Sequence, residues 1–170
     1  MKTPEKRFHK LMRGNPDRGE DGDHFVLSNR TLCDDGYLYC VATVLLGDRH
    51  AGILHSGYGN QRELNELATL IEVLSLEEHN LKGIIIAGAD NIALKMNEVL
   101  KQANIPLVSS YYDHYAIKVK ECGCCIVYGA EASRTKEMSY WRKEVVVNPR
   151  TSEVLIHSKK SGYVKLHPSP

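Results

Sequence analysis

The sequence predicts an α/β fold of the α+β type, in which two helices pack on one face of a mixed, mostly antiparallel β-sheet. Three observations support this prediction. Short runs rich in β-branched and aromatic residues recur between turn residues, two segments carry apolar residues at helical spacing, and residues 83–88 form the short apolar run typical of a strand buried on both faces. With 170 residues, 42% of them apolar, the chain has the size of one domain.

The first strands are predicted to follow a mobile N-terminal arm. Residues 1–23 are rich in charged residues, glycine and proline and show little periodicity, so we expect a mobile arm there and a single domain over 24–170. Residues 37–46 and 51–55 are rich in β-branched and apolar residues and are separated by a Gly-Asp turn signal. These two segments therefore predict a β-hairpin.

Two helices and several strands are expected further along the chain. Asn60 and Glu63 are spaced as in a capping box, and the apolar residues that follow predict a helix over about 61–78. Asp90 is placed to cap a second helix, over 91–103. The pattern then changes to strands, predicted at 107–111, 116–120, 124–128 and 144–147, with a closing hairpin around the polar turn 148–152.

The composition of the chain limits which partners and which cellular location we expect. The chain has 22 Lys and Arg against 21 Asp and Glu, a net charge of +1, so no nucleic-acid partner is expected. No apolar run approaches the length of a membrane span and no signal-peptide pattern is seen, so we expect no membrane insertion and no export by a classical signal. The five cysteines, at positions 33, 40, 122, 124 and 125, predict reduced thiols and a cytoplasmic location.

The predicted hairpin carries a thiol and an imidazole on neighbouring strands. A thiol attacks an acyl carbon only as the thiolate, and a nearby imidazole is the usual group that generates it near neutral pH. Cys40 and His55 lie on either side of the predicted turn, so antiparallel pairing can bring their side chains together on one face. The spacing alone leaves open that Cys40 is a small buried apolar residue and His55 a polar residue with structural partners.

Several segments resemble the chemoreceptor glutamine deamidase (CheD) family. They are Tyr-Cys-Val-Ala-Thr-Val at 39–44, Ala-Gly-Ile-Leu-His at 51–55, the apolar run ending in Ala-Gly-Ala at 83–89, Ile-Pro-Leu-Val at 105–108 and the closing hairpin at 142–155. The resemblance spans about residues 31–157. It implies a CheD-like fold, with Cys40 as the nucleophile and His55 as the general base and acid. Thr31 is the best match to the third catalytic position of the family.

The resemblance also implies an activity and a class of partner. A member of this family hydrolyses a glutamine side-chain carboxamide to glutamate through a thioester, without cofactor or metal, on a protein substrate such as a chemoreceptor. The glycine-rich signature that the family has after the Ile-Pro strand is replaced here by residues 111–115. Two alternatives stay open: a bacterial effector that deamidates a host protein, as cytotoxic necrotizing factor catalytic domains do, and a non-catalytic signalling adaptor of the same fold.

The cysteines at 122, 124 and 125 allow a metal interpretation. Structural zinc sites usually combine two separated pairs of ligands, and the only other cysteines are Cys33 and Cys40. We therefore expect Cys124 and Cys125 to belong to a strand and no metal to be bound.

Overall fold

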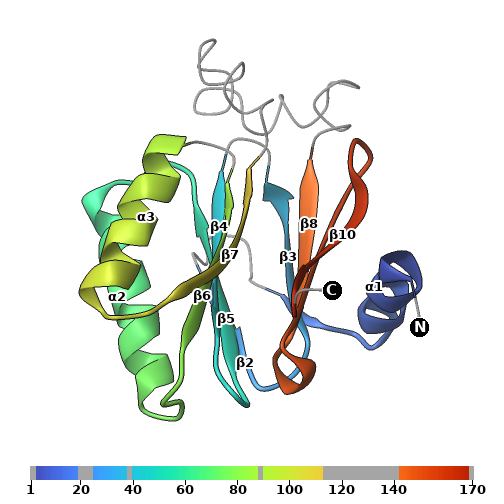
Figure 1. Cartoon of the computed structure of the whole chain (residues 1–170), viewed down its shortest axis with the longest axis horizontal. Coiled ribbons are helices and arrows are strands. Elements are labelled where there is room, and N and C mark those ends of the chain that lie inside the picture. The colour runs from blue at the N-terminus through green and yellow to red at the C-terminus, as the bar shows by residue number, and fades with distance from the viewer. Residues whose placement is uncertain (1–2, 19–24, 38–39, 88–89, 113–141, 169–170) are drawn as a thin grey trace.

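A computed structural model describes residues 3–18, 25–37, 40–87, 90–112 and 142–168 of the chain. These described residues form two five-stranded sheets and three α-helices. The elements lie in four layers, with two helices, a sheet, a second sheet and a single helix in order across the molecule (Figure 1). The predicted α+β class is confirmed, whereas the expectation of one sheet is wrong, because the strands divide between two.

The predicted hairpin lies at the centre of the first sheet, which we call the hairpin sheet. Its strands, in spatial order, are β2 (Phe25–Ser28), β5 (Ala51–Ser56), β4 (Val41–Leu46), β6 (Lys82–Ala87) and β7 (Leu107–Tyr112). Neighbours are antiparallel except for the parallel pair β6 and β7. The β4–β5 turn is fixed by the buried Glu78 carboxylate, which accepts the backbone N–H groups of Asp48, Arg49 and His50.

The second sheet, which we call the C-terminal sheet, contains strands that the sequence patterns only partly revealed. It consists of β1 (Asp17–Arg18), β3 (Leu32–Tyr37), β8 (Lys143–Asn148), β9 (Glu153–Ser158) and β10 (Gly162–His167). The predicted closing hairpin is present as β8 and β9, joined through the short 3-10 helix η1 (Pro149–Thr151). The strand expected over 37–46 is interrupted, because β3 ends in the C-terminal sheet and β4 starts in the hairpin sheet.

Two helices cover the outer face of the hairpin sheet, as predicted. The helix α2 (Gln61–Ser75) is shorter than expected and α3 (Asp90–Gln102) begins one residue earlier. Their buried apolar residues join one core cluster with the outward-facing residues of the sheet, Leu67, Leu70, Leu74, Ile92, Met96 and Leu100 against Val41, Leu45, Leu54 and Ile85. The Asn60 side chain accepts the N–H of Glu63 at 3.0 Å, which is one half of the predicted capping box.

The two sheets pack face to face over a second apolar core. Alternate residues of each strand point inward, so β4 contributes Ala42, Val44 and Leu46 while its other residues face the helices. The facing strands of the C-terminal sheet contribute Leu32, Val145, Val147, Val154 and Ile156. Most of the space between the two sheets is therefore filled by apolar side chains from both.

The N-terminal segment differs from the mobile arm that the sequence predicted. Residues Pro4–Arg13 form the helix α1, whose first turn is capped by the Thr3 hydroxyl. Phe8 and Leu11 are buried on the outer face of the C-terminal sheet, and Arg7 Nε donates to Glu153 at 2.7 Å. The helix has only a few apolar residues among many charged ones, so its sequence shows no clear helical periodicity. These few apolar residues are nevertheless enough to pack its inner face against the sheet.

Two predicted strands, at 116–120 and 124–128, lie outside the described residues. None of the helices in the described part of the chain is long and apolar enough to cross a membrane.

Docking of α1 should contribute measurably to stability. Phe8 is 3% exposed, so Phe8→Ala should lower the free energy of unfolding by about 3 kcal/mol, because it removes a large ring and leaves a cavity. Urea denaturation of the full chain measures the change. The control Lys10→Ala alters an exposed residue of the same helix and should change stability by less than about 0.5 kcal/mol. Equal stability of the Phe8 variant and wild type would mean that the helix does not dock.

Candidate active site

Cys40 and His55 lie on the same face of the hairpin sheet. His55 is in β5 directly opposite Ala42, and Cys40 stands two residues before Ala42, just ahead of β4. Because side chains alternate along a strand, both residues face the C-terminal sheet. Cys40 packs against the core between the sheets and is half-buried. The structure thus brings together the two residues that the sequence paired.

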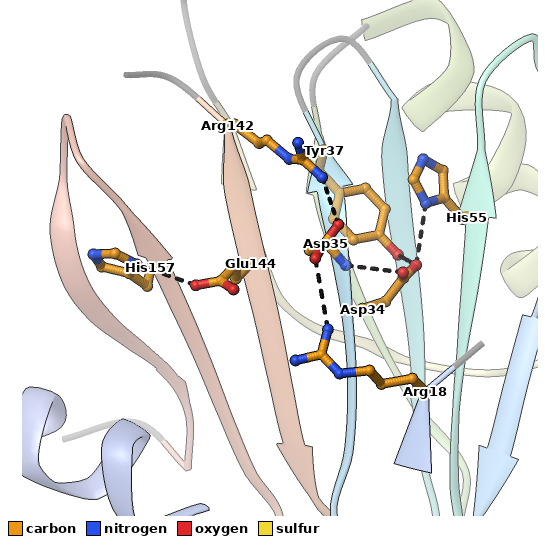
Figure 2. A network of polar contacts seen from close by, with 8 residues as sticks. All are labelled: Arg18, Asp34, Asp35, Tyr37, His55, Arg142, Glu144 and His157. Atoms are coloured by element: carbon orange, nitrogen blue, oxygen red, sulfur yellow. Dashed lines mark hydrogen bonds and ion pairs between the residues drawn. The ribbon is translucent and has the colours of Figure 1, made fainter. Parts of the chain in front are cut away.

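A third residue, which the sequence analysis missed, reaches His55 from the opposite sheet. Asp34 of β3 accepts a hydrogen bond from His55 through Oδ2, with His55 Nδ1 3.1 Å away (Figure 2). The same carboxylate accepts hydrogen bonds from the Tyr37 hydroxyl and from the backbone N–H of Asp35. The Tyr37 ring also stacks on the imidazole, with centroids 4.2 Å apart and planes inclined by 24°. Asp34 and Tyr37 therefore fix both the tautomer and the orientation of the imidazole.

The charge state of this cluster follows from its contacts. Burial by itself would lower the pKa of His55, but hydrogen bonds to Asp34 and Cys40, together with the electrostatic interaction with these two residues, raise it to about 10. Burial would raise the pKa of Asp34, but hydrogen bonds from His55 and Tyr37 hold it below its ordinary value. Burial, followed by the Asp34 charge, holds the pKa of Tyr37 well above its ordinary value. At neutral pH the cluster thus holds a carboxylate, an imidazolium and a neutral phenol.

This arrangement can hold a thiolate and deliver a proton. With Nδ1 committed to Asp34, the second ring nitrogen of His55 is the one left for Cys40 and for a ligand. A protonated imidazole beside a thiolate is the ion pair used for nucleophilic attack by sulfur. The same ring then carries the proton that a leaving group needs.

Thr31, the third residue carried over from the resemblance, is not brought to this cluster. It precedes β3 and stands on the opposite side of the chain from Leu32 and Asp34, since side chains alternate. Its carbonyl accepts the N–H of Asp17 at 2.9 Å, and it lines a separate surface hollow with Arg30 and Asn148. Asp34 occupies the place beside His55 instead.

The loop after β5 forms a wall beside the thiol. A Cβ on Gly57 would lie 3.6 Å from Cys40 Sγ, so a side chain at this position would contact the sulfur. The buried Glu63 carboxylate accepts the N–H groups of Gly57 at 2.9 Å, Tyr58 at 3.1 Å and Gly59 at 2.6 Å. Glu63 thus serves the loop rather than completing a capping box with Asn60. The hydrogen bonds from the loop to Glu63 could not be predicted, because no local sequence pattern relates a glutamate to the N–H groups of the preceding loop.

A second polar group lies at the edge of the cluster. Arg142 Nη2 binds Asp35 Oδ1 at 2.8 Å, and Arg18 approaches the other oxygen of Asp35 at 3.6 Å (Figure 2). A Cβ on Gly36, whose φ is +86°, would lie 3.6 Å from Arg142 Nη2 and 3.8 Å from His55 Cε1. The Arg142 guanidinium and the His55 imidazole therefore both lie close to the position that a side chain at Gly36 would occupy.

The other cysteines show no comparable environment in the part of the chain that the structure describes. Cys33 of β3 is buried towards α1, and burial raises its pKa to about 11, so it stays a thiol. The cysteines at 122, 124 and 125 lie outside the described residues, so their predicted strand is not addressed. Among the described residues, no group of three or more His, Cys, Asp or Glu side chains is arranged as a metal site.

No protein-family model matches this chain, and no curated protein matches it either.

Removing the Asp34 charge should lower the pKa of His55. In Asp34→Asn the amide keeps the size of the side chain but loses its charge, so the imidazolium is less stabilised. An NMR titration of the His55 Cε1 proton should give a midpoint near 10 in wild type and a clearly lower one in the variant. Asp35→Asn, next along the strand and bound to Arg142 instead, should leave the midpoint almost unchanged. An unshifted midpoint in Asp34→Asn would contradict the assignment.

The same pairing should make stability depend on alkaline pH. The pKa of His55 rises from 6.5 to about 10 on folding, so its contribution is complete below about 6.5 and is lost as the pH rises through about 10. The free energy of unfolding of wild type should therefore exceed that of His55→Gln most near pH 6 and least near pH 10. Urea denaturation across this range measures the difference. A difference that grows with pH would contradict a raised pKa of His55 in the folded protein.

Proposed function

We propose that this protein is a protein-glutamine deamidase that hydrolyses a glutamine carboxamide to glutamate through a thioester on Cys40. The observation that carries the proposal is the placement of His55, which interacts with Cys40 on its own sheet and with Asp34 on the facing sheet. Cys–His–carboxylate arrangements recur on unrelated folds that catalyse acyl transfer. The choice of a carboxamide rests on the resemblance of residues 39–44 and 51–55 to the CheD family.

The proposed reaction has two halves joined by the thioester. The Cys40 thiolate attacks the carboxamide carbon, the C–N bond breaks, and the His55 imidazolium gives its proton to the departing nitrogen, which leaves as ammonia. Neutral His55 then takes a proton from water, and the resulting hydroxide attacks the thioester carbon. The C–S bond breaks, glutamate leaves, and the thiolate and the imidazolium are restored. Asp34 keeps the ring oriented in both halves and stabilises its charge.

The donors for the oxyanion must come from the Cys40 side of the site. The N–H groups of Gly57, Tyr58 and Gly59 already donate to Glu63, so they are not free to stabilise a developing negative charge. The backbone N–H of Cys40 itself is our candidate, because it belongs to the same residue as the nucleophile. Thr31, which lies away from the cluster, has no part in the proposed reaction.

The proposed substrate is a protein with an accessible glutamine, either a chemoreceptor or, as the alternative, a host protein reached by a bacterial effector. A mass-spectrometric comparison of lysate proteins treated with wild type or with Cys40→Ser can find it, since only wild type should convert a glutamine to glutamate. Bacterial and mammalian lysates, tested in parallel, distinguish the two kinds of substrate. Absence of any site specific to wild type in both lysates would favour a non-catalytic adaptor.

Substitution of the paired residues should then abolish ammonia release from the protein so found. Cys40→Ser replaces the thiol by a hydroxyl of similar size but much lower acidity, and should reduce activity by about a thousandfold or more while preserving thermal stability. His55→Ala should lose nearly as much, and the double variant should be no worse, because the residues act as a unit.

A matched control is Cys33→Ser, which alters the other described cysteine. Cys33 is buried on the far face of β3, so this variant should lose stability but retain activity per folded molecule. Full activity in Cys40→Ser would show that the nucleophile is a different residue.

A further inference from the structure

An exposed tyrosine follows the glycine that lies next to the candidate nucleophile, on a loop that is held by hydrogen bonds. Tyr58 is 60% exposed and directly follows Gly57, at which a Cβ would lie 3.6 Å from Cys40 Sγ. Large aromatic side chains lose favourable burial when they face water, so an exposed one beside a reactive group is a candidate contact for a ligand.

The loop that presents Tyr58 is held from two sides. Glu63 of α2 accepts the three successive N–H groups of residues 57–59, and Lys95 Nζ of α3 donates to the Gly59 carbonyl at 2.9 Å. Gly59 has a φ of +62°, and a Cβ there would lie 3.3 Å from Ile92 Cγ1, so the path of the loop requires glycine. Both helices thus fix the backbone of Tyr58 while its ring remains in solvent.

We infer that Tyr58 is a specificity-determining residue that packs against the polypeptide flanking the target glutamine. This inference rests on the proposed function and adds to it a class of contact: an apolar side chain or peptide plane next to the glutamine. An aromatic ring on a fixed backbone binds with little loss of conformational entropy, which is why tyrosine is common at the centre of protein contacts. Glu63 is then a positioning residue, acting through the loop.

Two affinity probes separate recognition of the flanking chain from recognition of the glutamine. The first is free glutamine in which a chloromethyl ketone replaces the carboxamide. The second places the same side chain at the centre of an acetylated, amidated pentapeptide with leucines at the other positions. In each case the Cys40 sulfur bonds to the methylene carbon as chloride leaves, and mass spectrometry of the full-length protein follows the rate at which Cys40 is alkylated.

Wild type should react about tenfold faster with the peptide probe than with the free probe, the effect expected of one well-packed aromatic contact. Tyr58→Ala should reduce this preference to about twofold or less and leave the rate with the free probe unchanged. Tyr58→Phe should keep the preference, since the ring makes the contact. The control Leu76→Ala removes another exposed apolar side chain, 77% exposed after the far end of α2, and should also keep it.

Three results would overturn the inference. They are a wild type that does not prefer the peptide, a preference that survives Tyr58→Ala, and an equal slowing of both probes in that variant, which would mean that Tyr58 supports the thiol instead. Failure of both probes to alkylate Cys40 in wild type is a distinct outcome: it would refute recognition of glutamine itself, and with it the proposed function.

Discussion

The hydrogen bond between Asp34 and His55 joins two sheets whose facing surfaces are mostly apolar. A carboxylate and an imidazolium placed between such sheets lose hydration, and this cost is offset only where each polar atom finds a partner. Asp34 meets this condition with one oxygen shared by His55 and the Tyr37 hydroxyl and the other accepting the N–H of Asp35. The position of β3 opposite β5 is therefore a requirement of the site as well as of the fold.

This constraint explains why the site is built from separate layers. The hairpin sheet supplies Cys40 and His55, the C-terminal sheet supplies Asp34, and the two outer helices hold the loop at 57–59 through Glu63 and Lys95. No one layer contains a complete set of partners for the imidazole and the thiol. The relative placement of the layers, which depends on the apolar cores between them, sets the distances that the chemistry would need.

The sequence predicted well those elements whose local pattern and tertiary environment agree. The hairpin of β4 and β5, the helices α2 and α3 and the apolar strand β6 all have a clear period and a buried face. The strand β3 was missed because Asp34, Asp35 and Gly36 are poor strand formers, and the contacts that hold them there come from distant segments. Local pattern predicted the pairing of Cys40 with His55, because both residues belong to one hairpin. It could not predict Asp34, which reaches His55 from the other sheet, and Thr31 was proposed in its place. Strand β10 was missed as well, because it is only half-buried and lies beyond the last clear turn signal.

The poor strand formers in β3 supply polar groups to the candidate site. An aspartate pair followed by a glycine weakens a strand, yet here Asp34 binds an imidazole and Asp35 binds two guanidinium groups. Locally unfavourable residues are tolerated where they place polar groups, which is why functional sites often break the rules of local propensity. Loosening the contact between the sheets would thus disturb the Asp34–His55 pair before it unfolded either sheet, since each sheet keeps its own backbone hydrogen bonds.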